Sequence, residues 1–147
     1  MKSNLYKLFA LLIATVAVIA CSKKATTKSN TELLTQGTWK FASAGLDADK
    51  NGSVDMEDGT IQACDKDNTA TFNAGDTGFN DEGATKCDIS APQTKAFTWH
   101  FKNAEKDLEF DGKTFTILSI NDSQLKVYFD SDLGGGNIVR YLLILTH

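Results

Sequence analysis

Residues 97–129 read FTWHFKNAEKDLEFDGKTFTILSINDSQLKVYF, and this stretch carries the clearest pattern in the sequence. Aromatic and polar residues alternate over positions 97–101, and a period of two places the aromatic side chains on one face of a strand. Asp111-Gly112 separates the apolar runs 108–110 and 114–120, and Asp-Gly is a strong signal for a two-residue hairpin turn. The stretch therefore predicts an antiparallel meander with one face in a hydrophobic core.

The same pattern continues downstream. Leu125–Phe129 places apolar side chains at alternate positions, and Gly134-Gly135-Gly136 is predicted to connect it to the run Ile138–Leu145. That run is apolar on both faces except for Arg140 and Tyr141. It is therefore expected to lie centrally in the sheet or to be covered on both sides.

Shorter strand signals, separated by Gly, Asn and Asp, fill the residues upstream. We expect a short helical turn near Thr31–Gln36, followed by strands at 38–44, at one or two places between 54 and 72, and near 79. Together with the strands of the meander, about eight strands are expected. Sequential antiparallel strands with short connections predict an all-β, up-and-down barrel, because closure leaves no bare sheet edge.

The first twenty residues have the features of a secretion signal. Lys2 and Lys7 precede or flank a run of thirteen residues without charge, Leu8–Ala20. A membrane-spanning helix needs about 20 apolar residues, so this run is too short for a stable transmembrane anchor. Residues 1–20 are therefore predicted to be removed after export.

Cys21 follows Val18-Ile19-Ala20, and these four residues resemble the bacterial lipobox, whose cysteine becomes acylated. The resemblance implies a lipoprotein held at the membrane by its acyl chains. The alternatives are an ordinary secretory signal or a core cysteine. Residues 21–31 are polar and small and are predicted to form a tether, since they contain no large apolar side chain to bury.

The length of the remaining domain, residues 32–147, is sufficient for a single hydrophobic core, and its charge excludes some classes of partner. The chain has 15 basic and 19 acidic residues, and loss of Lys2 and Lys7 leaves 13 against 19, a net charge of −6. Such an acidic surface disfavours binding to nucleic acid, because the phosphates of nucleic acid are also negatively charged.

In an oxidising compartment Cys64 and Cys87 form an even pair and are predicted to make a disulfide. Two free thiols or a zinc pair are the alternatives.

Gly37-Thr38-Trp39 opens the first predicted strand and resembles the Gly-x-Trp motif of lipocalins, in which the Trp closes the barrel floor. The layout over residues 33–147 is similar to that of lipocalin-like lipoproteins common in Bacteroidetes. The resemblance implies that Arg140, the only arginine, packs over Trp39. A core Trp after a helix-capping glycine is the alternative to the lipocalin motif.

The segment after Cys21 also bears on localisation. Surface-exposed lipoproteins of the Bacteroidetes often carry an acidic signal after the cysteine, and the segment SKKATTK lacks one. We therefore expect the protein to be anchored in the outer membrane and to face the periplasm.

Residues 47–58 read DADKNGSVDMED and match the calcium-loop pattern D-x-[DN]-x-[DN]-G. The loop resembles those of EF-hands and dockerins. The expected Ca²⁺ ligands are the oxygens at the ligand positions of such loops, namely Asp47, Asp49, Asn51, the Ser53 carbonyl, Asp55 and Asp58.

Two features of this loop depart from an EF-hand. Position 12 holds Asp58 in place of the usual Glu, so Glu57 is an alternative ligand. The preceding residues are strand-like, which predicts a structural calcium loop between strands. A solvated polar turn is the alternative, although five carboxylates and one lysine in twelve residues favour a bound cation.

The sequence contains no nucleophile elbow, glycine-rich phosphate loop or H-E-x-x-H motif. The leading hypothesis is therefore a non-enzymatic, lipid-anchored envelope protein that binds a small apolar molecule inside its barrel. A solid barrel that serves as an accessory module of an envelope complex is the second hypothesis. An enzyme is the third.

Overall fold

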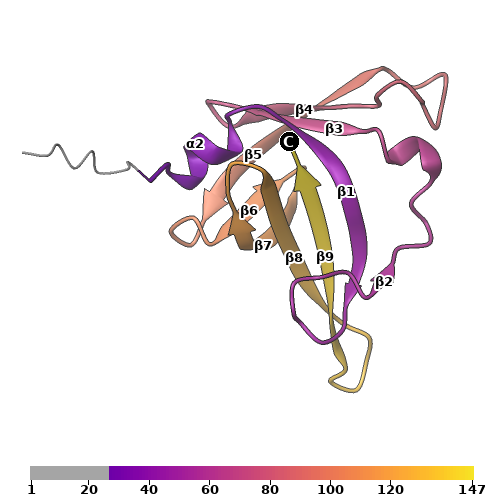
Figure 1. Ribbon diagram of the computed structural model, residues 1–147, viewed down its shortest axis with the longest axis vertical. Coiled ribbons are helices and arrows are strands. Elements are labelled where there is room, and N and C mark those ends of the chain that lie inside the picture. Colours follow the sequence, from indigo (N-terminus) through magenta and orange to yellow (C-terminus); the bar gives the residue numbers. More distant parts are fainter. Residues whose placement is uncertain (1–26) are drawn as a thin grey trace, which may run out of the picture.

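The computed structural model describes residues 27–147 (Figure 1). The predicted signal peptide and Cys21 lie outside the described residues. The described part holds one α-helix, one 3₁₀ turn and nine strands: α2 Asn30–Leu34, β1 Thr38–Asp47, β2 Met56–Glu57, η1 Ala63–Asp65, β3 Thr69–Asn73, β4 Thr77–Asp81, β5 Thr94–Lys102, β6 Asp107–Phe110, β7 Lys113–Ile120, β8 Gln124–Asp132 and β9 Ile138–Thr146. The predicted all-β class is confirmed.

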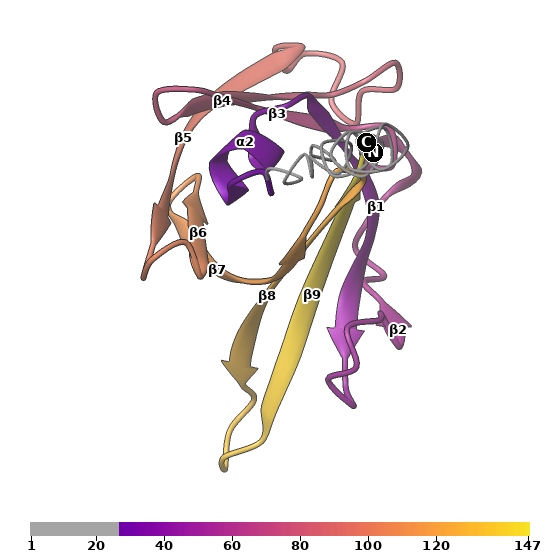
Figure 2. The ribbon, with the colours of Figure 1, turned by 60° about the vertical axis from the view of Figure 1, so that its left-hand side comes forward.

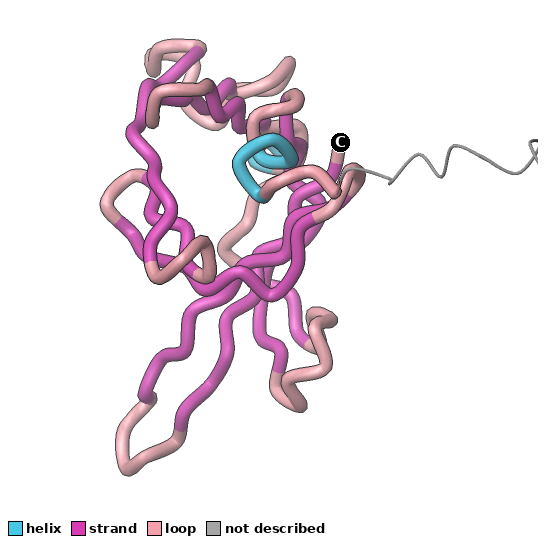
Figure 3. Tube along the Cα trace, turned by 90° about the vertical axis from the view of Figure 1, so that its left-hand side faces the viewer, coloured by secondary structure: helices cyan, strands magenta, loops and turns pink. Residues whose placement is uncertain are grey.

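Eight of the nine strands close into an antiparallel barrel. Neighbours along the chain pair from β3 to β9, and the circle closes because β1 pairs with β3 through residues 38–40 and with β9 through residues 40–47. β2 pairs only with the end of β1 and stands outside the circle. The predicted up-and-down barrel is therefore confirmed, and Figures 2 and 3 show its ring of strands, with the β1–β2 and β8–β9 ends extending beyond it.

The Asp111-Gly112 turn joins β6 to β7 as its sequence predicts. Phe110 pairs with Lys113, so the loop has two residues, and both adopt positive φ values of 49° and 74°. A two-residue turn with two positive φ angles has the twist that adjacent antiparallel strands require. This turn fixes the register of the meander.

The predicted short helical turn near Thr31–Gln36 is confirmed as α2, which begins one residue earlier, at Asn30. Ser29 caps its first turn, and Glu32 completes a capping box by accepting a hydrogen bond from the Ser29 backbone N–H. Residues 29–31, part of the predicted tether, therefore belong to the cap and first turn. Leu33 and Leu34 are buried, so the helix packs onto the barrel through its apolar side.

The core lies at the α2 end of the barrel, where inward-facing residues from most strands meet. Phe97 and Trp99 are buried as their alternation predicts, and the Trp99 indole donates to the carbonyls of Asn73 and Thr77. The other buried members of this cluster are Leu34, Trp39, Ala70, Phe72, Leu108, Phe115, Leu125, Val127 and Leu145. Within residues 27–147 the structure has no helix long and apolar enough to cross a bilayer.

The predicted disulfide between Cys64 and Cys87 is present, with a Cα–Cα distance of 5.3 Å. It ties η1 to the loop between β4 and β5, two segments with little regular secondary structure. Because both sulfur atoms are used in the bond, the zinc-pair alternative does not apply to the oxidised chain.

Candidate functional site

The predicted calcium loop lies between β1 and β2, and it brings three carboxylates together. Asp47 ends β1 and is completely buried, whereas Asp49 and Asp55 are exposed. One carboxylate oxygen from each residue lies within 4.8 Å of the other two. This spacing allows one cation to contact all three side chains.

Gly52 sits at the bend of this loop and has a φ of 80°. Its N–H donates to Asp47 Oδ2 at 3.1 Å, and a Cβ at this position would lie 2.9 Å from the Leu118 side chain. Lys126 on β8 donates to the Gly52 carbonyl at 2.6 Å. The loop is therefore folded back against β7 and β8, a conformation that requires glycine at its bend.

Asn51 and Ser53, also predicted ligands, are engaged within the loop. The Asn51 amide donates to Asp49 Oδ2 at 2.8 Å, and its oxygen accepts from the Ser53 backbone N–H at 2.8 Å. Asp55 Oδ2 accepts from the Ala48 N–H at 2.7 Å. These bonds hold the loop in a compact turn around the three carboxylates.

Within the described residues, the buried Asp47 carboxylate lacks a hydrogen-bond donor for one of its oxygens and a basic side chain as an ion-pair partner. Its Oδ1 atom is buried and has no hydrogen-bond donor. Across residues 27–147, no basic side chain forms an ion pair with Asp47, Asp49 or Asp55. A buried carboxylate oxygen without a partner is costly, and several clustered carboxylates repel one another. The donor set and its missing partner fit a hard cation such as Ca²⁺.

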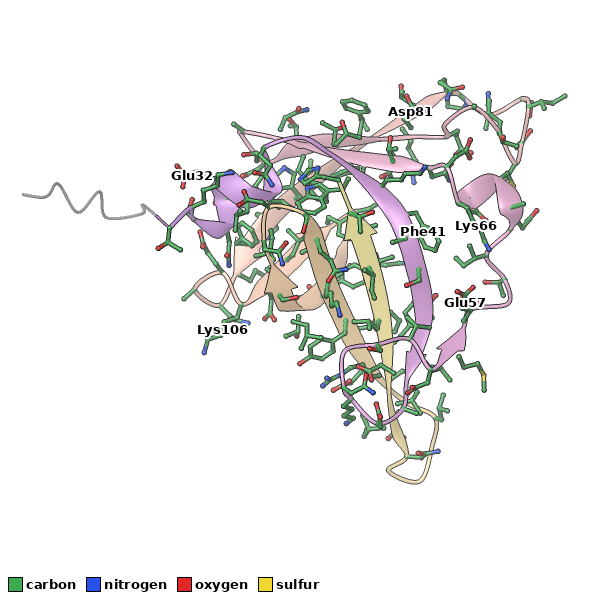
Figure 4. The ribbon with its side chains drawn as sticks, in the orientation of Figure 1. Glu32, Phe41, Glu57, Lys66, Asp81 and Lys106 are labelled. Carbon is green, nitrogen blue, oxygen red and sulfur yellow. A yellow bond between two sulfur atoms is a disulfide. The ribbon has the colours of Figure 1, made fainter. Side chains whose placement is uncertain are left out.

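Asp58 does not lie in this carboxylate cluster, which corrects its predicted role. β2 pairs with β1 through Gly45 and Leu46, so the chain after the loop runs back along β1. The Asp58 N–H donates to the Ala44 carbonyl at 2.9 Å, three residues before Asp47. Glu57, the alternative ligand, is exposed opposite Gly45 and is labelled on β2 in Figure 4.

The Asp58 side chain instead bonds to β9. Its Oδ2 accepts a hydrogen bond from the Tyr141 hydroxyl, and its Oδ1 accepts from the N–H and hydroxyl of Thr60. The Tyr141 bond, followed by those from Thr60, lowers the pKa of the Asp58 carboxyl below its ordinary value. Burial, together with the nearby carboxylate, raises the pKa of Tyr141. Tyr141 thus stays protonated and donates to a charged Asp58.

Asp58 and Tyr141 lie on the wall of a pocket of about 800 Å³. The pocket is mainly apolar, with Lys113 and Thr114 as its other polar residues. Its apolar lining comes from Phe41, Ala44, Ile61, Phe115, Phe129 and Leu143. Figure 4 shows Phe41 on β1, the strand that also leads into the carboxylate loop.

A row of aromatic rings connects this pocket to the core. The Phe110 and Phe115 rings stack with centroids 5.0 Å apart, Phe129 meets Phe115 edge-on at 6.0 Å, and Phe129 stacks on Tyr141 at 5.1 Å. Such pairs favour offset or edge-on contacts and form rigid apolar walls. The row offers flat surfaces to an apolar ligand.

A second pocket of about 470 Å³ adjoins the first and shares Phe41, Ile61 and Leu143 with it. Trp39 and Leu145, at the filled end of the barrel, belong to its lining. The barrel is therefore packed near α2 and hollow beyond it.

Trp39 closes the packed end of the barrel. It is completely buried, and its indole N–H donates to the Leu34 carbonyl of α2 at 2.8 Å. The His147 ring packs on Trp39 with centroids 3.8 Å apart, and a Cβ at Gly37 would lie 3.3 Å from that ring. Gly37 therefore leaves room for His147, a contact that no motif in the sequence indicates.

Arg140 does not pack over Trp39, which corrects the role implied by the lipocalin resemblance. β1 and β9 are antiparallel, and their register pairs Arg140 with Asp47, at the far end of β1 from Trp39. The Arg140 guanidinium lies 3.7 Å from the centroid of the Tyr128 ring and donates to Asp130. Arg140 thus stabilises the β8–β9 hairpin.

Comparison with known proteins identifies the family. The model of the family described as "Lipocalin-like domain" matches residues 35–127, which is more than half of the 147-residue chain. No curated protein and no solved structure matches the chain significantly. The match begins next to Gly37 and includes both the carboxylate loop and most of the barrel. The chain therefore belongs to the lipocalin-like domain family.

Proposed function

We propose that this protein is a non-enzymatic binding protein whose barrel takes up one small apolar molecule. The observation that carries the proposal is the pocket of about 800 Å³ lined by Phe41, Phe115, Phe129 and Leu143. Ligand pockets in proteins have volumes of about 300–1,000 Å³ and combine apolar walls with a few polar groups. Lipocalin-like domains are generally binding modules, which agrees with this reading.

A fluorescence titration with N-phenyl-1-naphthylamine tests the proposal. The probe is expected to bind with one saturable site, and Phe129→Ala is expected to weaken its affinity about ten-fold, because the stacked ring is lost from the pocket wall. Leu133→Ala is the control, since Leu133 is 66% exposed on the same hairpin and does not line the pocket. Non-saturable binding, or equal losses in the two variants, would reject the barrel pocket as the binding site.

The proposal includes a lipid anchor at Cys21 in the outer membrane, with the barrel facing the periplasm. Its support is the short apolar leader followed by the lipobox-like residues 18–21. Cys21→Ala is expected to abolish fatty-acid incorporation and to move the protein out of the membrane fraction. Metabolic labelling with a radioactive fatty acid measures this, and a labelled Cys21→Ala chain would contradict the anchor.

The proposal also includes a structural Ca²⁺ ion in the β1–β2 loop. It is supported by the three clustered carboxylates and by the buried Asp47 Oδ1 atom that has no donor. A cation that binds only the folded chain stabilises it by mass action.

A second candidate function rests on exposed apolar residues at the protruding end of the molecule. Met56, Leu133 and Ile138 are 65%, 66% and 46% exposed and lie on the β1–β2 and β8–β9 segments that extend past the ring in Figure 2. Contiguous exposed apolar patches mark protein–protein interaction sites, and we infer that these residues would contribute to one that binds another protein of an envelope complex. Loss of complex formation in Leu133→Ser, with unchanged probe affinity, would favour this function over ligand binding.

A further inference from the structure

We propose that a Ca²⁺ ion held by Asp47, Asp49 and Asp55 tightens ligand binding in the barrel, because it fixes the hairpin that forms one wall of the pocket. The inference rests on the proposed function and adds to it a regulation of the same pocket. The proposal also limits the carboxylate ligands of the Ca²⁺ ion to three, because the Asp58 side chain lines the pocket.

The cation site spans both arms of the β1–β2 hairpin. Asp47 lies at the end of β1 and Asp55 lies directly before β2, so an ion bound by both joins the two arms of the hairpin. The ion supplies the missing partner of the buried Asp47 Oδ1 atom. Ca²⁺ takes six to eight oxygens, so loop carbonyls and water complete a site that three carboxylates begin.

The strand β2 has few backbone hydrogen bonds to hold it in place. β2 has two residues, Met56 and Glu57, and pairs only with β1. Two backbone bonds flank this pairing, from the Asp55 N–H to Leu46 O at 2.8 Å and from the Asp58 N–H to Ala44 O at 2.9 Å. A short edge strand with few bonds opens readily, so an ion at its base stabilises it.

The hairpin also contributes to the wall of the pocket. Ala44, Asp58 and Tyr141 all line the pocket, and the Asp58 carboxylate accepts the hydrogen bond of the Tyr141 hydroxyl. Tyr141 pairs with Leu46 across β1 and β9, one residue before Asp47. Separation of β2 from β1 would therefore displace the part of the pocket wall around Asp58, whose backbone N–H donates to Ala44 on β1.

Two binding sites that share one such element are coupled reciprocally. If calcium tightens ligand binding by a given factor, the ligand tightens calcium binding by the same factor. Couplings of this kind in proteins amount to about 5- to 150-fold in affinity. We expect the lower part of this range, because the hairpin forms only one of the pocket walls.

The experiment measures both affinities on the soluble chain from Ser22 onward, which lacks the anchoring Cys21 and contains every residue of the barrel. N-phenyl-1-naphthylamine is titrated in EGTA and in millimolar CaCl₂ at matched ionic strength, and calcium binding is measured by calorimetry with and without the probe. Calcium is expected to lower the Kd of the probe at least about five-fold, and the probe is expected to lower the calcium Kd equally.

Three variants separate the parts of the proposal. Asp49→Ala removes an exposed ligand and is expected to abolish both calcium binding and the calcium effect on the probe. Glu57→Gln is the matched control, because it removes an exposed charge from the same hairpin outside the cluster. Tyr141→Phe removes only the bond to Asp58 and is expected to keep calcium binding while the calcium effect on the probe shrinks.

Amide hydrogen exchange over residues 56–61 adds a measurement that needs no ligand. Calcium is expected to slow exchange there in the wild type and in Glu57→Gln, but not in Asp49→Ala. Calcium binding with no change in probe affinity or exchange would overturn the coupling and leave the proposed ligand function intact. Probe binding without any calcium binding would overturn the cation site, whereas an absence of probe binding would reject the ligand function and the coupling together.

Discussion

Trp39→Ala is expected to lower the free energy of unfolding by about 3–5 kcal/mol, the usual cost of deleting a large buried aromatic side chain. Trp39 is completely buried, donates to the Leu34 carbonyl and packs on the His147 ring. The substitution leaves a cavity between α2 and the barrel and removes the donor of a buried carbonyl. Since domains of this size are stable by about 5–15 kcal/mol, this is a large part of the total.

Urea denaturation followed by Trp99 fluorescence measures this loss, because Trp99 remains as a buried reporter. Met56→Ala is the control, since Met56 is 65% exposed and its removal should change stability by less than about 0.5 kcal/mol. A Trp39→Ala loss no larger than that of Met56→Ala would show that the packed end of the barrel does not depend on this residue.

Replacing both cysteines by serine, Cys64→Ser with Cys87→Ser, is expected to lower the free energy of unfolding by about 3.4 kcal/mol. The bond spans a sequence separation of 23 residues, and the value follows from the entropy of closing such a loop in the unfolded chain. The segments it joins have little regular secondary structure, and beside the disulfide the backbone N–H groups of Ala84 and Thr85 donate to the Asp67 carboxylate.

Thermal or urea melts of the wild type with and without a reductant provide the measurement. The reduced wild type and the double variant should melt together, about 14 °C or more below the oxidised wild type, since about 1 kcal/mol shifts the midpoint by about 4–8 °C in a domain near this size. Identical melts of oxidised and reduced protein would contradict a stabilising role for the disulfide.

Local signals predicted the barrel well. Alternation over residues 97–101 and the Asp111-Gly112 turn each correspond to an observed strand or hairpin, because strand periodicity and tight turns depend on residues close in sequence. The start of α2 was placed too late because its N-cap, Ser29, lies in a polar segment without apolar residues. The capping pair Ser29 and Glu32 was the available signal.

The misplaced roles of Asp58 and Arg140 have a common cause, because both depend on strand register. The calcium-loop pattern assumes that the chain continues into a helix after position 9, whereas here β2 turns back along β1 and carries Asp58 to Tyr141. The position of Arg140 depends on the antiparallel pairing of β1 with β9, which places it opposite Asp47. Neither register follows from residues close in sequence.

The pocket could not be predicted from residues that are close in sequence. Inward-facing aromatic residues can either fill a small barrel or line a cavity in it, and the difference depends on how rings from distant strands pack. Here Phe72 and Phe97 fill one end, whereas Phe41 and Phe129 border the open space at the other. The sequence predicts the supply of aromatic rings but not this division.

Native mass spectrometry of the soluble chain from Ser22 onward, purified without detergent and incubated with an organic extract of the cell envelope, tests directly whether the barrel holds a ligand. We expect a complex of one chain with one apolar molecule of a few hundred daltons, a size suited to the pocket of about 800 Å³. Phe129→Ala should lower its occupancy and Leu133→Ala should not. A spectrum that shows only the polypeptide without a ligand, under conditions in which the chain is folded, would contradict the proposed ligand-binding function.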